Sequence, residues 1–192
     1  MKKNFPKVIF FYSAIYDRLL TEYEGKCFEE EQKKEIEEFI QKFEKKWRKI
    51  EEPAFKFLIP LIQPKKIDRE IICYVVKNLK WTGFSHPLTI RASTIWETKS
   101  TLLHEIVHIL FSRSVKREKI LQKLKENFPF ESHRTLEHIY VNLVHYLVLK
   151  RLFKKRTIKN LLAKYQRFKD TGRIWKIVLE NEKKLKKILL ED

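Results

Sequence analysis

The stretch Ser100-Thr101-Leu102-Leu103-His104-Glu105-Ile106-Val107-His108-Ile109-Leu110-Phe111 decides how the chain is interpreted. Its apolar residues fall on every face of a helical projection, which predicts a buried helix. His104 and His108 are four residues apart, so they share one face and can present two imidazole nitrogens to a single metal ion. Buried polar side chains need partners, which a metal ion supplies here. The alternative is that ordinary hydrogen bonds satisfy them.

Zinc is the ion that this pattern predicts, because zinc accepts imidazole ligands in tetrahedral geometry. Glu105 lies beside the histidine face and could take a proton from a water molecule and pass it to a leaving group. We therefore predict a zinc cofactor, with Glu105 as the general acid and base of a hydrolase.

A catalytic zinc site uses three protein ligands and keeps one open position, so a third ligand must come from elsewhere. The helix expected over residues 132–153 is the natural source, because its apolar stretch carries polar side chains. His138, Asn142 and His145 share one stripe of this helix, and Glu137 precedes them.

From Trp81 to Leu149 the chain resembles the small zincin-fold metallopeptidases, whose signature is His-Glu-x-x-His. The matching segments are Pro87-Leu88-Thr89-Ile90, Leu103-His104-Glu105-Ile106-Val107-His108 and Thr135-Leu136-Glu137-His138-Ile139-Tyr140-Val141-Asn142. The resemblance implies a peptidase that acts on a peptide or protein, with residues 88–92 aligning the extended substrate. Two features depart from the known subfamilies: no third histidine follows soon after His108, and no aspartate stands four residues after Glu137.

The resemblance also guides the choice of third ligand. In the gluzincin subfamily, a polar residue four positions after that ligand supports a ligand histidine, and residues four apart lie on one helix face. Asn142 stands four residues after His138, whereas Val141 stands four after Glu137. We predict His138, with Glu137 as the alternative.

The expected fold class is α+β, mostly helical, with a small sheet before the zincin-type active-site helix. Two or three strands are predicted between Pro53 and Ser93, including residues 70–76 and 88–92, from β-branched runs between proline and glycine residues. A helix is predicted from Phe28 to Ile50 and closed by Pro53. After the motif we predict helices at about 116–128, 132–153, 158–168 and 173–190, with Gly172 as an interruption. We expect a zincin-like metallopeptidase domain over residues 1–153 and a basic C-terminal helical extension over 154–192.

The formal net charge is +17, and residues 150–192 contain fifteen Lys and Arg against five Asp and Glu. Such a surplus usually forms solvated helix faces, but it also suits an anionic partner such as nucleic acid. The alternative function is therefore a basic helical nucleic-acid-binding protein with a structural zinc site.

No stretch approaches the roughly 20 apolar residues of a membrane-spanning helix, so we expect no membrane partner. The run Val8-Ile9-Phe10-Phe11-Tyr12 only faintly imitates a signal peptide, because Asp17 and Arg18 follow it and no cleavage site is apparent. Cys27 and Cys73 fit no paired spacing, and we expect both to be buried thiols. A cytoplasmic location is the resulting expectation.

Overall fold

The computed structural model describes residues 5–190 and confirms an α+β, mostly helical fold with a small four-stranded sheet. Its elements run in the order β1 (Lys7–Phe11), α1 (Ala14–Tyr23), α2 (Glu31–Ile62), β2 (Glu70–Val76), β3 (Gly83–Ser85), β4 (Leu88–Arg91), α3 (Ile95–Ser112), α4 (Arg117–Asn127), α5 (His133–Leu152), α6 (Lys155–Tyr165), α7 (Lys169–Glu180) and α8 (Glu182–Leu190). Among the described residues, no helix combines the length and the apolar character that crossing a membrane requires.

The chain forms two compact units. Unit 1 comprises residues 1–56 and 66–109, and unit 2 comprises residues 57–65 and 110–192. Residues 154–192, expected to form a C-terminal extension, belong to unit 2 together with α4 and α5. The charge is divided unevenly: the sequence of unit 2 holds twenty-three Lys and Arg against nine Asp and Glu, and that of unit 1 nineteen against sixteen.

The sheet of unit 1 has the strand order β1-β2-β4-β3. The first three strands in this order are parallel, and β3 runs antiparallel to β4. The predicted strands at residues 70–76 and 88–92 correspond to β2 and β4. The apolar run near the N-terminus forms β1, a strand that the sequence analysis did not predict.

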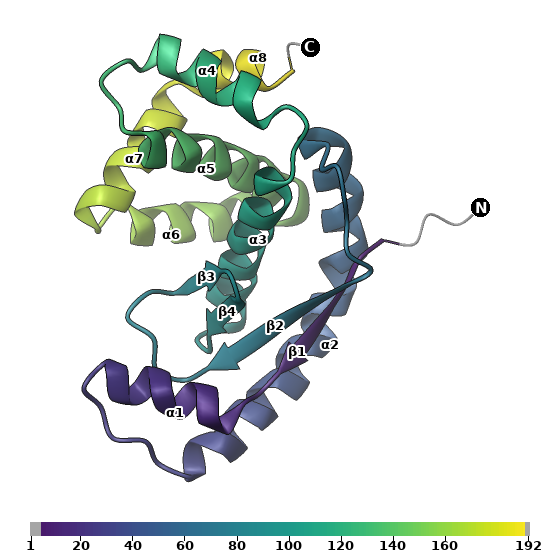
Figure 1. The fold of residues 1–192 in the computed structure, drawn as a ribbon, viewed down its shortest axis with the longest axis vertical. Coiled ribbons are helices and arrows are strands. Elements are labelled where there is room, and N and C mark those ends of the chain that lie inside the picture. The colour runs from purple at the N-terminus through teal and green to yellow at the C-terminus, as the bar shows by residue number, and fades with distance from the viewer. Residues whose placement is uncertain (1–4, 191–192) are drawn as a thin grey trace. The chain divides into compact units, whose positions relative to one another are not determined.

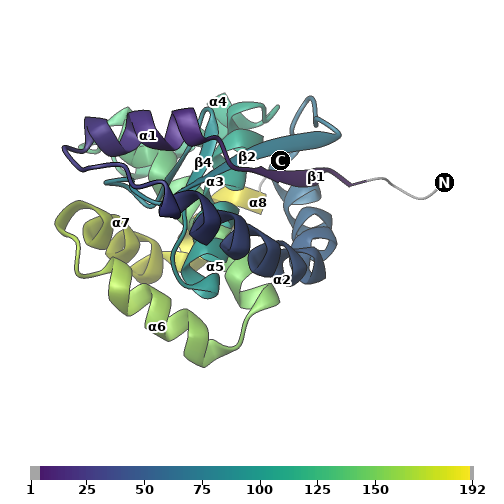
Figure 2. The same ribbon diagram turned by 90° about the horizontal axis from the view of Figure 1, so that it is seen from below.

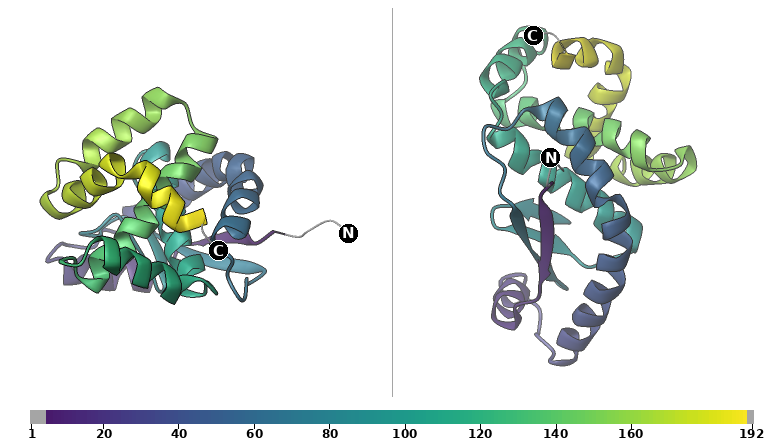
Figure 3. Two further views of the ribbon diagram at one scale, coloured as in Figure 1. Left: turned by 90° about the horizontal axis from the view of Figure 1, so that it is seen from above. Right: turned by 90° about the vertical axis from the view of Figure 1, so that its right-hand side faces the viewer.

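The outer edge of β1 is covered by α2, which runs along this strand (Figures 1 and 3). The backbone N–H of Val8 donates to Glu51 Oε1 at 2.7 Å, and Arg48 Nη2 donates to the Val8 carbonyl at 2.8 Å. Trp47 Nε1 donates to the same Glu51 oxygen at 2.8 Å. Edge strands expose unpaired backbone groups, and here side chains of α2 satisfy those of Val8.

The prediction that Pro53 ends this helix was wrong, because α2 continues to Ile62. An internal proline removes one backbone hydrogen bond and costs about 3 kcal/mol. Phe55, Leu58 and Ile62 follow it on α2, and each side chain is fully buried. Burial of each large apolar side chain contributes about 1.5–3 kcal/mol, so together they outweigh the defect.

In unit 2, α5 is the central helix, and α6 and α7 pack beside it (Figure 2). His145 of α5 is 1% exposed and lies among aromatic rings. Its ring centroid is 5.8 Å from that of Trp175 on α7 and 6.5 Å from that of Tyr165 on α6. The Tyr165 and Trp175 rings stack with centroids 5.7 Å apart. His145 therefore has a packing role in the core of unit 2.

The prediction for the C-terminal helices was wrong in two respects. Gly172 does not interrupt a helix but lies within α7, and the expected single helix over 173–190 is divided at Asn181 into α7 and α8. A Cβ at Gly172 would lie 2.6 Å from the carbonyl oxygen of Gln166. The glycine thus allows α7 to approach the preceding turn closely.

We expect Glu51→Ala to lower the free energy of unfolding by about 3 kcal/mol, because the buried donors of Val8 and Trp47 would lose their acceptor. Glu52→Ala is the matched control, since Glu52 is the exposed neighbour. Urea denaturation of both variants measures the difference. Equal stability of the two variants would contradict this role of Glu51.

Candidate metal centre

Threonine side chains at the start of helix α3 accept hydrogen bonds from nearby backbone N–H groups. Thr94 Oγ1 accepts a hydrogen bond from Glu97 N at 3.3 Å, and Thr98 Oγ1 accepts one from Ser93 N at 3.2 Å. Leu102, Leu103, Ile106 and Val107 are at most 1% exposed. The prediction of a helix buried on several faces is confirmed.

The side chains of His104 and His108 are less buried than these apolar neighbours. Both are only partly buried, and their Nε2 atoms lie 3.2 Å apart. Two imidazole ligands bound tetrahedrally at about 2.0–2.1 Å from zinc have nitrogens roughly 3.3–3.4 Å apart. The histidine pair therefore fits a shared zinc ion with little adjustment, and its partial exposure provides access from solvent.

Glu105 is 7% exposed, and burial raises its pKa to about 8. A cation held by the neighbouring histidines would favour the carboxylate form. Cys73 of β2 is fully buried, and burial, followed by the charge of Glu105, raises the pKa of its thiol. Cys73 is thus the buried thiol that the sequence predicted, whereas the same prediction for Cys27 was wrong, because Cys27 is exposed.

Strand β3 approaches α3 at Gly83. A Cβ on this glycine would lie 2.7 Å from Thr101 Cγ2 and 3.3 Å from Glu105 Cγ. The strand order puts β3 at the end of the sheet, whereas β4 pairs with β2 on one side and with β3 on the other. The expectation that residues 88–92 align a substrate strand was therefore wrong, since neither side of β4 is open. The sheet edge nearest Glu105 belongs to β3.

His138 lies on α5, in unit 2, where its hydrogen bonding sets the position of its proton. Nδ1 is 2.8 Å from the carbonyl oxygen of Arg134, which can only accept, so Nδ1 carries the proton. This tautomer places the lone pair on Nε2, and such a backbone contact is typical of metal-ligating histidines. The adjacent Glu137 instead forms an ion pair with Arg117 of α4.

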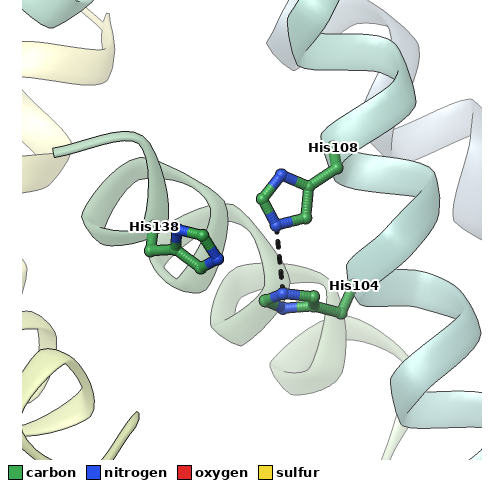
Figure 4. A group of neighbouring side chains, drawn as sticks. All are labelled: His104, His108 and His138. Carbon is green, nitrogen blue, oxygen red and sulfur yellow. Dashed lines mark hydrogen bonds between the residues drawn. The ribbon is translucent and has the colours of Figure 1, made fainter. Parts of the chain in front are cut away.

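One ring nitrogen from each of His104, His108 and His138 lies within 4.8 Å of those of the other two (Figure 4). All three side chains are partly buried. Neither Glu137 nor His145 belongs to this group. Asn142, the predicted supporting residue, is 2% exposed.

Arg134, Tyr140, His145 and Tyr146 of α5 are residue types that can stabilise an oxyanion, but their contacts in unit 2 assign this role to none of them. Tyr140 stacks on Phe111 with ring centroids 3.8 Å apart, and Tyr146 packs edge-on against Trp175. His145 belongs to the aromatic core described above. Arg134 contributes its carbonyl to His138.

The side chains of Trp81 and Trp96 in unit 1 are exposed. The sequence alone did not indicate this exposure. Trp81 is 64% exposed, two residues before β3, and Trp96 is 49% exposed, in the first turn of α3. The Nζ of Lys80 lies 5.7 Å from the ring centroid of Trp81, and that of Lys99 lies 5.3 Å from that of Trp96. Only their surroundings in the fold reveal this exposure.

No family model, curated protein or solved structure matches the chain. The function must therefore be inferred from the chemistry of the site.

We expect Gly83→Ala to destabilise the protein by about 1–3 kcal/mol, because the new methyl group would overlap Thr101 and displace β3 from α3. Thermal unfolding measures this change. Ser85→Ala, at the other end of β3, is the control and should melt close to the wild type. Wild-type stability of Gly83→Ala would show that β3 does not approach α3 so closely.

Proposed function

We propose that this protein is a zinc-dependent hydrolase, specifically a peptidase, in which His104, His108 and His138 hold the metal ion and Glu105 is the general acid and base. The observation that carries the proposal is the group of three ring nitrogens, one each from His104, His108 and His138, together with the buried Glu105 next to His104 on α3. We further propose that the protein works in the cytoplasm.

The chemistry divides between the ion and the side chains. When bound, zinc would lower the pKa of a water molecule and polarise a substrate carbonyl. Glu105 follows His104 directly, so its carboxylate would accept the proton of the attacking water and return it to the leaving amine. The apolar surroundings that bury Glu105 limit its access to bulk water and hold it in place.

The contacts within unit 2 support His138 over Glu137 as the third ligand. Arg117 pairs with Glu137, and a guanidinium that neutralises a carboxylate weakens that carboxylate as a ligand for a cation. His138 already has the tautomer that a ligand through Nε2 requires. A histidine ligand therefore needs less rearrangement than a glutamate ligand.

A peptide is the substrate that the sheet favours. Strand β3 lies at the end of the strand order and, at Gly83, beside the Glu105 side chain. An extended peptide can pair with such an edge through its backbone. In this proposal the edge of β3, and not residues 88–92, would align the substrate.

The second candidate is a nucleic-acid-binding protein that uses zinc only structurally. It is favoured by the charge of unit 2, where cations exceed acids by more than two to one. A closed structural zinc site normally has four protein ligands, whereas the group in the described residues has three. We therefore rank the hydrolase first.

The first test of the metal centre is its zinc content. The wild type should bind about one zinc ion per chain, and His104→Ala should lose most of it. Elemental analysis after zinc loading and gel filtration gives the stoichiometry, with His86→Ala, which alters an exposed histidine, as the control. Equal zinc content in the wild type and His104→Ala would exclude the site.

Glu105→Gln separates metal binding from catalysis. It should retain zinc, because Glu105 is not a ligand, and lose at least about a hundredfold in kcat/KM, because the proton acceptor is gone. A peptide-library cleavage assay first identifies a substrate. Hydrolysis by Glu105→Gln at the wild-type rate would show that Glu105 has no catalytic role.

His138→Ala and Glu137→Ala decide the third ligand. We expect His138→Ala to weaken zinc binding by more than about a hundredfold, which exceeds the usual effect of residues that only support a ligand. Glu137→Ala should bind zinc nearly as the wild type does. Competition with a chromophoric chelator measures both affinities, and the reverse order would assign the third ligand to Glu137.

A further inference from the structure

The turn between α4 and α5, residues 128–132, carries the most exposed large apolar side chain among the described residues. Phe130 is 99% exposed. Exposed apolar residues are common, but they usually rest partly on the protein surface. The Phe130 ring has almost no contact with the rest of the chain, so it does not stabilise the fold.

This turn is nevertheless held firmly by its neighbours. Glu131 N donates to the Phe128 carbonyl at 3.1 Å and closes a turn in which Pro129 restricts the backbone. Lys125 Nζ donates to the Pro129 carbonyl at 2.6 Å and to the Glu131 carbonyl at 3.2 Å. Phe130 is thus presented on a preorganised turn, which lowers the entropic cost of binding through it.

A second exposed phenylalanine belongs to the same end of unit 2. Arg173 of α7 binds both carboxylate oxygens of Glu131, at 2.5 and 2.9 Å, and so ties the Phe130 turn to α7. Phe168 stands at the N-cap of α7 and is 59% exposed. In Figures 1 and 2 the α6–α7 connection lies at the outer end of α7. We call the two loops, residues 128–132 and 166–169, the aromatic tip.

Cations outnumber acids among the exposed charged residues beside these rings. Arg167 and Lys169 flank Phe168 directly, and Arg134 follows the Phe130 turn; all three are exposed. The exposed acids nearby are Glu126 and Asp170, whereas Glu131 is already paired with Arg173. The aromatic tip therefore combines protruding apolar rings with a surplus of positive charge, within the more basic unit of the chain.

We propose that the aromatic tip docks onto an anionic lipid bilayer surface, with Phe130 and Phe168 entering the headgroup region and the neighbouring cations contacting lipid phosphates. Protruding rings can enter a bilayer surface without a pocket of matching shape. Binding to a protein partner or stacking on a base would instead require a complementary surface. Cationic side chains add to such binding near anionic lipids. The expectation of no membrane partner rested on the lack of a spanning segment, which surface binding does not require. The metal centre has no part in this proposal.

Cosedimentation of the full-length protein with vesicles tests the proposal. Phosphatidylcholine vesicles containing about a third phosphatidylserine should bind the protein, and pure phosphatidylcholine should bind it at least about tenfold more weakly. Binding should weaken as salt rises, because screening reduces the attraction. Phe130→Ala should weaken binding to the anionic vesicles about tenfold, because the apolar burial of this ring is lost. The double variant Phe130→Ala with Phe168→Ala should weaken binding further.

The matched control is Val115→Ala, which removes a 57% exposed apolar side chain elsewhere in unit 2 and should bind as the wild type does. Thermal melting of every variant verifies that the fold is intact, and the exposure of Phe130 predicts no change. Three results would overturn the proposal: no binding to the anionic vesicles at low salt, unchanged binding by the double variant, or binding only to a single-stranded oligonucleotide with the same phenylalanine dependence. The last result would assign the tip to nucleic acid.

Discussion

The burial of α3 is the constraint on which the rest of unit 1 depends. A helix with apolar residues on nearly every face must be covered on several sides, and the sheet provides part of that cover at Gly83, where only a hydrogen fits against Thr101. Within this apolar setting Glu105 is almost fully buried, and its pKa is raised to about 8. An isolated carboxylate there costs free energy, and a cation bound by the adjacent histidines would offset that cost. Burial thus connects the packing of the helix with the chemistry proposed for it.

Features encoded by local spacing could be predicted from the sequence. The four-residue interval between His104 and His108 predicted that they share a face, and the 3.2 Å separation of their Nε2 atoms agrees. Alternation and β-branching located β2 and β4. Position within the sheet was not predictable, because it depends on which strands pair. The sequence pointed to residues 88–92 as a substrate-aligning strand, but the antiparallel addition of β3 places β4 in the interior of the sheet.

Two helix boundaries were predicted wrongly where the surroundings of a proline or glycine outweigh its local signal. Pro53 is a strong local stop, yet α2 continues through it because the apolar side chains that follow are buried. Gly172 has a high intrinsic cost in a helix, yet it lies inside α7, where a Cβ would collide with the Gln166 carbonyl. In both places a residue that disfavours a helix is retained by contacts that a local pattern cannot represent.

The choice between His138 and Glu137 shows how a site can depend on a distant residue. Both side chains occupy the same turn of α5, and the sequence offered only the residue four positions further along to distinguish them. The structure adds Arg117, twenty residues earlier, whose guanidinium pairs with Glu137. This ion pair joins the carboxylate to α4, whereas His138 Nδ1 donates to the Arg134 carbonyl and so leaves the lone pair on the other ring nitrogen, Nε2. Under the proposed function, a contact remote in sequence would therefore decide which of two adjacent polar residues binds the metal ion.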